Sequence, residues 1–63
     1  MFEVGDVFTW PDGTKFEIVL IVEDDPNYTG PVAWVHDVTG DWPMYLSALE
    51  NSLGKGEIER ATR

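Results

Sequence analysis

Short stretches of β-branched and aromatic residues alternate along the chain with short groups of turn-forming residues. Val4–Trp10 is the first such stretch, and Thr14–Val22 is the second. Between them, Pro11–Gly13 has the residues of a type I turn followed by a glycine bulge. Two strand-like stretches joined by so short a turn predict a β-hairpin.

The second stretch is apolar on both faces at its centre. Alternate residues of a strand lie on the same face, yet Ile18–Val22 is an unbroken run of five apolar residues. A strand buried on both sides at its middle suits a tightly curled sheet or a small barrel. We therefore expect Ile18 and Leu20 to be buried together, in a core that they share with Leu49 and Ile58.

The middle of the chain predicts two further strands. Glu23–Gly30 is expected to be a loop, and Val32–Asp37 a third strand. Val38–Asp41 supplies the next turn, and Trp42–Tyr45 reads as a short fourth strand. Pro43 confines that strand to an edge or a bulge, because proline cannot donate a backbone hydrogen bond.

A short helix is predicted at Leu46–Leu53, where leucines recur at three- and four-residue spacing. Ser47 and Glu50 have the spacing of a capping box, and Gly54 is the expected stop signal. Gly56–Ala61 then predicts a last strand with Ile58 inward.

This order of elements predicts a mainly β fold, an SH3-like small β-barrel of about five strands with one short helix before the last strand. Residues 1–63 are expected to form a single domain. The sequence contains no cysteine, so neither a disulfide nor a thiolate zinc site can stabilise it. The longest apolar run is far below the ~20 residues that span a bilayer, so no membrane segment is expected.

Several segments resemble a family of phage proteins. They are Phe2–Phe8 (F-x-V-G-D-V-F), Asp12–Phe16 (D-G-T-K-F) and the C-terminal pattern L-x-x-L…E-I-E-R-A, formed by Leu46, Leu49 and Glu57–Ala61. In these segments the chain is similar to small, mostly uncharacterised acidic proteins of tailed bacteriophages, especially those of actinobacteria. The resemblance implies an accessory protein made in the host cytoplasm during infection, with a host protein as partner. It implies no catalytic or binding residues.

Charge narrows the classes of partner. The chain has twelve acidic and four basic residues, which gives a net charge of −8. Lys15 is the only lysine or arginine before Lys55. Such a field repels nucleic acids and anionic membranes, so direct binding to either is not expected. A protein partner with a basic surface is favoured instead. The alternative explanation is that the acidity serves solubility alone.

Catalytic and metal-binding patterns are missing. His36 is the only histidine, and its neighbour Asp37 should point to the opposite face of the strand. There is no nucleophile elbow and no glycine-rich phosphate loop. Glu23–Asn27 offers oxygen ligands but lacks the spacing of a calcium-binding loop. We therefore expect no enzymatic activity, no metal and no cofactor.

The candidate binding surface combines the acidic loop with nearby aromatic residues. Tryptophan and tyrosine are enriched at binding hot spots. Trp34 is expected to lie in the core, whereas Trp42 is expected to be an exposed contact residue beside Pro43. The candidate binding residues are Glu23, Asp24, Asp25, Tyr28, Trp42 and Tyr45.

Three functions fit this pattern. The first is a monomeric, non-enzymatic interaction module that binds and modulates a host protein through an acidic, aromatic face. The second is a DNA mimic, whose carboxylates replace phosphates in a nucleic-acid-binding cleft. The third is a minor structural component of the virion.

Overall fold

Residues 2–61, which the computed structural model describes, form an antiparallel sheet and a helix. The elements are β1 (Val7–Thr9), β2 (Lys15–Val22), β3 (Val32–Asp37), β4 (Gly40–Tyr45), α1 (Leu46–Gly54) and β5 (Glu59–Arg60). The strand order is β4-β3-β2-β1-β5, and each neighbouring pair is antiparallel. The prediction of a mainly β fold with one short helix before the last strand is confirmed.

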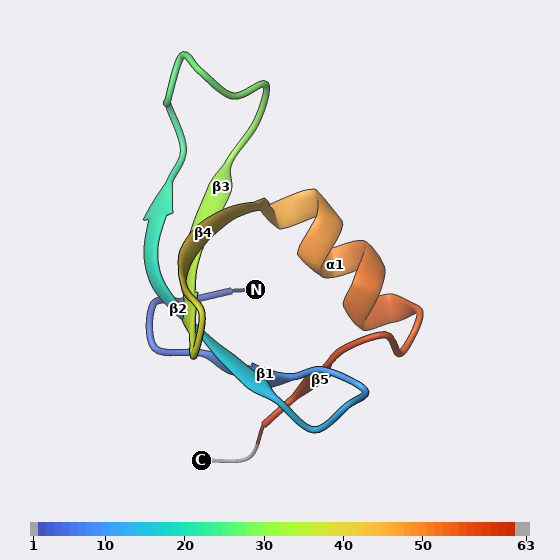
Figure 1. Ribbon diagram of the computed structural model, residues 1–63. Coiled ribbons are helices and arrows are strands. Elements are labelled where there is room, and N and C mark those ends of the chain that lie inside the picture. The colour runs from blue at the N-terminus through green and yellow to red at the C-terminus, as the bar shows by residue number, and fades with distance from the viewer. Residues whose placement is uncertain (1, 62–63) are drawn as a thin grey trace.

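The sheet bends into an arc, and α1 lies on its concave side (Figure 1). β4 and β5 are the two edges and do not pair with each other, so the sheet is open. Pro43 lies in the edge strand β4, as its missing N–H requires.

The core lies between the concave face and the helix. It is a cluster of seven buried residues from β1, β2, β3, α1 and the segment before β5: Phe8, Phe16, Ile18, Ala33, Val35, Leu49 and Ile58. The expected burial of Ile18, Leu49 and Ile58 is therefore confirmed.

The expected burial of Leu20 is wrong, because β2 contains a β-bulge. Ile18 pairs with Val35, and Leu20 pairs with Trp34, which directly precedes Val35 on β3. Val19 therefore has no partner on β3 and is the extra residue of the bulge. The bulge moves Leu20 to the convex face, where it is 51% exposed, and it brings Ile21 against the core instead. β2 is therefore not buried on both faces at its middle.

The first hairpin has the predicted turn. The Gly13 N–H donates to the Trp10 carbonyl at 2.9 Å, and Gly13 has a φ of 91°. The Asp12 carboxylate accepts hydrogen bonds from the Thr14 hydroxyl at 2.6 Å and from its N–H at 2.9 Å. These bonds hold the pKa of Asp12 below its ordinary value.

β1 is shorter than the predicted Val4–Trp10 because a turn precedes it. Gly5 has a φ of 98°. The Glu3 N–H donates to the Asp6 carboxylate at 2.9 Å, and the Asp6 N–H donates back to the Glu3 carbonyl at 3.1 Å. This pair of bonds closes the turn before the strand can begin.

The predicted capping box is wrong, because the N-cap lies two residues before Ser47. β4 leads directly into α1, so Tyr45 is the N-cap and makes no side-chain capping bond. Ser47 is therefore already inside the first turn. The Leu46 N–H donates instead to the Pro31 carbonyl at 3.0 Å, which satisfies one of the free donors of the helix end.

The helix ends at Gly54, close to the prediction, but Gly56 provides the left-handed turn with a φ of 76°. The Gly56 N–H donates to the Leu53 carbonyl at 3.2 Å, and the Glu57 N–H donates to the Ser52 carbonyl at 2.9 Å. This is a Schellman motif. It occupies Gly56 and Glu57, which is why β5 is shorter than the predicted Gly56–Ala61.

Substitutions of two leucines test the placement of the β-bulge. Leu49→Ala should lower the free energy of unfolding by about 2–5 kcal/mol, because Leu49 is fully buried. Leu20→Ala is the matched control, and it should cost less than about 1 kcal/mol, because this side chain already contacts water. Urea unfolding followed by tryptophan fluorescence measures both. A loss for Leu20→Ala as large as that for Leu49→Ala would contradict the placement of the bulge.

Candidate functional site

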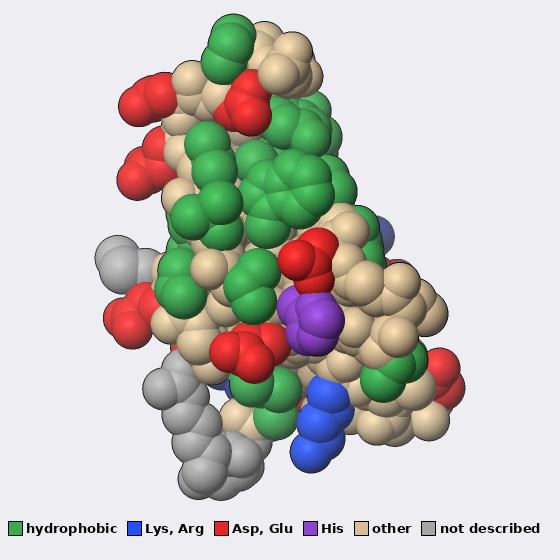
Figure 2. Space-filling view, turned by 60° about the vertical axis from the view of Figure 1, so that its left-hand side comes forward, with side chains coloured by type: hydrophobic (Ala, Val, Ile, Leu, Met, Phe, Trp, Pro, Cys, Tyr) green, Lys and Arg blue, Asp and Glu red, His purple; other side chains and the backbone are tan. Residues whose placement is uncertain are grey.

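The convex face of the sheet carries a continuous apolar surface over β2, β3 and β4. Two cross-strand rows, Leu20–Trp34–Pro43 and Val22–Val32–Tyr45, lie next to each other, and Val19 adjoins the first at the bulge. We call these seven residues the convex apolar face. Three of its side chains are clearly exposed, namely Leu20 at 51%, Val19 at 40% and Tyr45 at 38%, whereas Val32 is buried and the other three are half-buried. Figure 2 shows hydrophobic side chains gathered along this side of the molecule.

Carboxylates stand at both ends of the convex apolar face. At one end, Glu17, His36 and Asp41 form the next cross-strand row, and all three are exposed. At the other end, β2 leads into the loop that begins with Glu23 and Asp24, both exposed. Figure 2 shows Asp and Glu side chains around the apolar area. The surface is therefore apolar in the middle and has carboxylates at both ends, with His36 among them at one end.

His36 has an acidic partner that the sequence analysis missed. Its Nδ1 is hydrogen-bonded to the Asp41 carboxylate, and the two side chains are 60% and 57% exposed. This hydrogen bond raises the pKa of His36 above its ordinary value of 6.5, and the negative charges of Asp41, Asp37 and Glu17 add to the effect. The register of the β3–β4 hairpin, with Asp37 opposite Gly40, places His36 opposite Asp41. A correct register of this hairpin would have revealed the pair.

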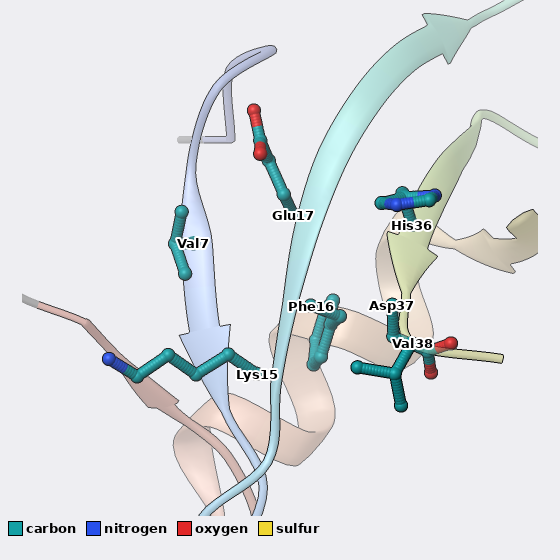
Figure 3. A pocket seen from close by; sticks show the side chains of 7 residues that line it. All are labelled: Val7, Lys15, Phe16, Glu17, His36, Asp37 and Val38. Atoms are coloured by element: carbon teal, nitrogen blue, oxygen red, sulfur yellow. The ribbon is translucent and has the colours of Figure 1, made fainter. Parts of the chain in front are cut away.

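A shallow hollow of about 270 Å³ lies beside His36 (Figure 3). Its lining is formed by Val7, Lys15, Phe16, Glu17, His36, Asp37 and Val38. This lining holds no hydroxyl or thiol group that the imidazole could activate, and Lys15 extends away from His36. The arrangement is that of a surface ion pair and lacks the nucleophile of a catalytic dyad.

The three predicted carboxylates of the loop do not act together. The Asp25 carboxylate accepts a hydrogen bond from the Asn27 N–H at 2.9 Å, so it holds the loop in shape. Glu23 lines a second hollow, together with Phe2, Ile21 and other residues beside the helix. Asp24 is exposed. Asp25 thus holds the loop and Glu23 lies beside the helix, which leaves Asp24 as the remaining exposed carboxylate of this loop.

The two predicted tyrosines do come together. The rings of Tyr28 and Tyr45 meet edge to face, with centroids 5.9 Å apart and an interplanar angle of 84°. Tyr45 belongs to the convex apolar face, so Tyr28 extends that face toward the acidic loop.

Trp34 and Trp42 occupy positions opposite to those expected. Trp42 is half-buried against the core, where its ring stacks on Trp10 at 6.2 Å and its Nε1–H donates to the Asp37 carboxylate at 3.2 Å. Trp34 lies outside the core cluster, half-buried on the convex apolar face beside the exposed Leu20. The alternation of side chains along β3 accounts for both positions. Val35 points into the core, so its cross-strand partner Trp42 lies on the core face, and the neighbouring Trp34 lies with its partner Pro43 on the opposite face.

Other kinds of site find no support among residues 2–61. No three imidazole or carboxylate groups in this range are grouped so that they could hold a metal ion. No helix in the described part of the chain is both long and apolar enough to cross a membrane. Comparisons of the chain with protein-family models, curated proteins and solved structures find no match.

The ion pair of His36 can be tested by titration. We expect the pKa of His36 to lie above 6.5 and to fall in Asp41→Asn, because the carboxylate that stabilises the imidazolium is then lost. A raised pKa in the folded state stabilises the fold below the unfolded value, and this contribution disappears as the pH rises through the folded value.

The measurement is the chemical shift of the imidazole protons against pH. Asp24→Asn, at the far end of β2, is the control and should leave the pKa in place. An unchanged pKa in Asp41→Asn would contradict the pairing.

Proposed function

We propose that the chain is a non-enzymatic protein-interaction module that binds and modulates a host protein through the convex apolar face. The observation that carries this proposal is the combination of contiguous apolar side chains, with Val19, Leu20 and Tyr45 exposed among them, and carboxylates at the ends of their rows. Apolar residues scattered singly over a surface need no explanation, but contiguous ones mark contact sites. Here they lie in adjacent cross-strand rows.

The partner that fits this surface has an apolar centre and a basic rim. Trp34 and Tyr45 are the aromatic residues of the face, and such residues dominate binding energy in desolvated interfaces. Glu17, Asp41 and Asp24 are exposed at its ends. Charges in that position steer association and add less to the final affinity.

The biological setting follows the resemblance to phage proteins. We infer a phage accessory protein that acts as a monomer in the host cytoplasm, with neither nucleic acid nor membrane as its direct target. We also infer that the open sheet is a variant of the SH3-like small barrel. The five antiparallel strands and the helix before the last strand support this inference.

The DNA mimic is the less favoured alternative. A mimic needs carboxylates spread along one face, in the places of phosphates. The centre of the convex face is apolar instead, and its carboxylates lie at the ends. Four other aspartates, Asp6, Asp12, Asp25 and Asp37, accept hydrogen bonds from nearby backbone N–H groups in turns.

The test is capture of the partner by tagged protein from host lysate, followed by titration of the captured protein. Tyr45→Ala should weaken binding by about 2 kcal/mol, as loss of a hot-spot aromatic does. Leu20→Ser should also weaken it. Val38→Ser is the matched control, because Val38 is 94% exposed in the β3–β4 turn, and its affinity should equal that of the wild type.

Duplex DNA added as a competitor separates the two functions. For an interaction module, DNA leaves binding intact, and double neutralisation by Glu23→Gln and Asp24→Asn mainly slows association. Displacement of the partner by DNA, together with unchanged affinity in Tyr45→Ala and Leu20→Ser, would exclude the module and favour the mimic.

A further inference from the structure

We infer that the partner segment on the convex apolar face is an amphipathic α-helix whose apolar stripe has Lys or Arg at both ends. This inference rests on the proposed function and specifies the chemistry of its partner. It follows from the uncovered layer of the sheet, from the blocked edges and from the positions of the carboxylates.

One face of the sheet is covered and the other is not. On the concave side, α1 places Leu49 in the core, with Leu46 and Leu53 against it. On the convex side, no helix or strand among residues 2–61 covers Leu20, and Tyr45 remains 38% exposed beside the Tyr28 ring. A sheet with an apolar face is normally covered by a second layer, and a helix on a sheet is one of the stable arrangements.

The edges of the sheet are poor places for a partner strand. Pro43 removes an N–H from the middle of the edge strand β4, so a strand added there would lack a hydrogen bond. The other edge, β5, has only two residues, Glu59–Arg60. Short edges and edge prolines both hinder strand addition. A partner therefore gains most contact by lying on the face.

The charges set the length and polarity of the docked segment. Seven residue steps separate Glu17 from Asp24, and the bulge takes up one of them, so the remaining six correspond to roughly 20 Å at the rise of a strand. A helix covers roughly the same length with about 13 residues. A basic residue at one end of a helix of about four turns can therefore reach Glu17 and Asp41, and a basic residue at the other end can reach Asp24. Between these basic residues, the apolar side chains of the helix cover Leu20, Trp34 and Tyr45.

Synthetic peptides test this inference without the natural partner. The probe is a 16-residue helical peptide with leucines at i, i+3, i+4 and i+7 spacing and two lysines at each end. One control has the same composition with the leucine spacing scrambled, and the other has a proline in the middle of the stripe. Binding to the whole protein is followed by amide chemical shifts and by tryptophan fluorescence.

The helical probe should shift the amides of Leu20, Trp34 and Tyr45, and both control peptides should bind roughly tenfold more weakly or worse. Leu20→Ser should weaken the probe by a similar factor, whereas Val38→Ser should not. The double variant Glu17→Gln/Asp41→Asn should lower the affinity for the probe several-fold at low salt and less at high salt.

Equal binding of the proline peptide, binding at another surface or no binding of any peptide would overturn the inference of a helix. These outcomes leave the proposed function standing if Leu20→Ser and Tyr45→Ala still weaken capture of the host partner. If Leu20→Ser and Tyr45→Ala capture the host partner as well as the wild type does, the proposed function itself is wrong.

Discussion

Because of the extra residue Val19, the single strand β2 contributes side chains both to the concave core and to the convex apolar face. Before the bulge, the Ile18 side chain is buried, and its backbone accepts from the Gly5 N–H at 2.8 Å and donates to the Asp6 carbonyl at 2.9 Å. After the bulge, Ile21 faces the core and Leu20 faces outward. Without it, strict alternation would bury Leu20 and remove it from the convex row. The concave core and the convex apolar face thus depend on the same irregularity.

Part of the negative charge belongs to carboxylates that hold turns. Four aspartates in the described part of the chain hold turns through backbone hydrogen bonds, as Asp37 does with Thr39 at 2.8 Å. The Thr39 hydroxyl and N–H lower the pKa of Asp37, and the Thr14 hydroxyl and N–H lower that of Asp12. Their stabilisation is present above the ordinary carboxyl pKa and is lost as the pH falls through the lowered values. Four of the twelve acidic residues therefore serve local structure while they keep their charge.

Local signals in the sequence predicted most elements but not the register of the strands. The bounds of β3, the Gly13 turn and the edge position of Pro43 follow from side-chain type and turn chemistry. The bulge does not, because a run of five apolar residues looks the same in either register. The exchanged positions of Trp34 and Trp42 and the His36–Asp41 pair have the same cause. They depend on which residues face each other across strands, and composition carries no information on that.

The division of the eight aromatic residues supports a function for the convex face. Five of them form a connected group on the concave side: Phe2, Phe8, Trp10, Phe16 and Trp42. Within it, ring centroids lie as close as 4.9 Å, which adds packing energy to a small core. Tyr28, Trp34 and Tyr45 lie outside this group. Tyr45 is exposed, and Tyr28 and Trp34 are half-buried. These three rings are the ones that the proposed partner would contact, since aromatic side chains dominate the binding energy of interfaces.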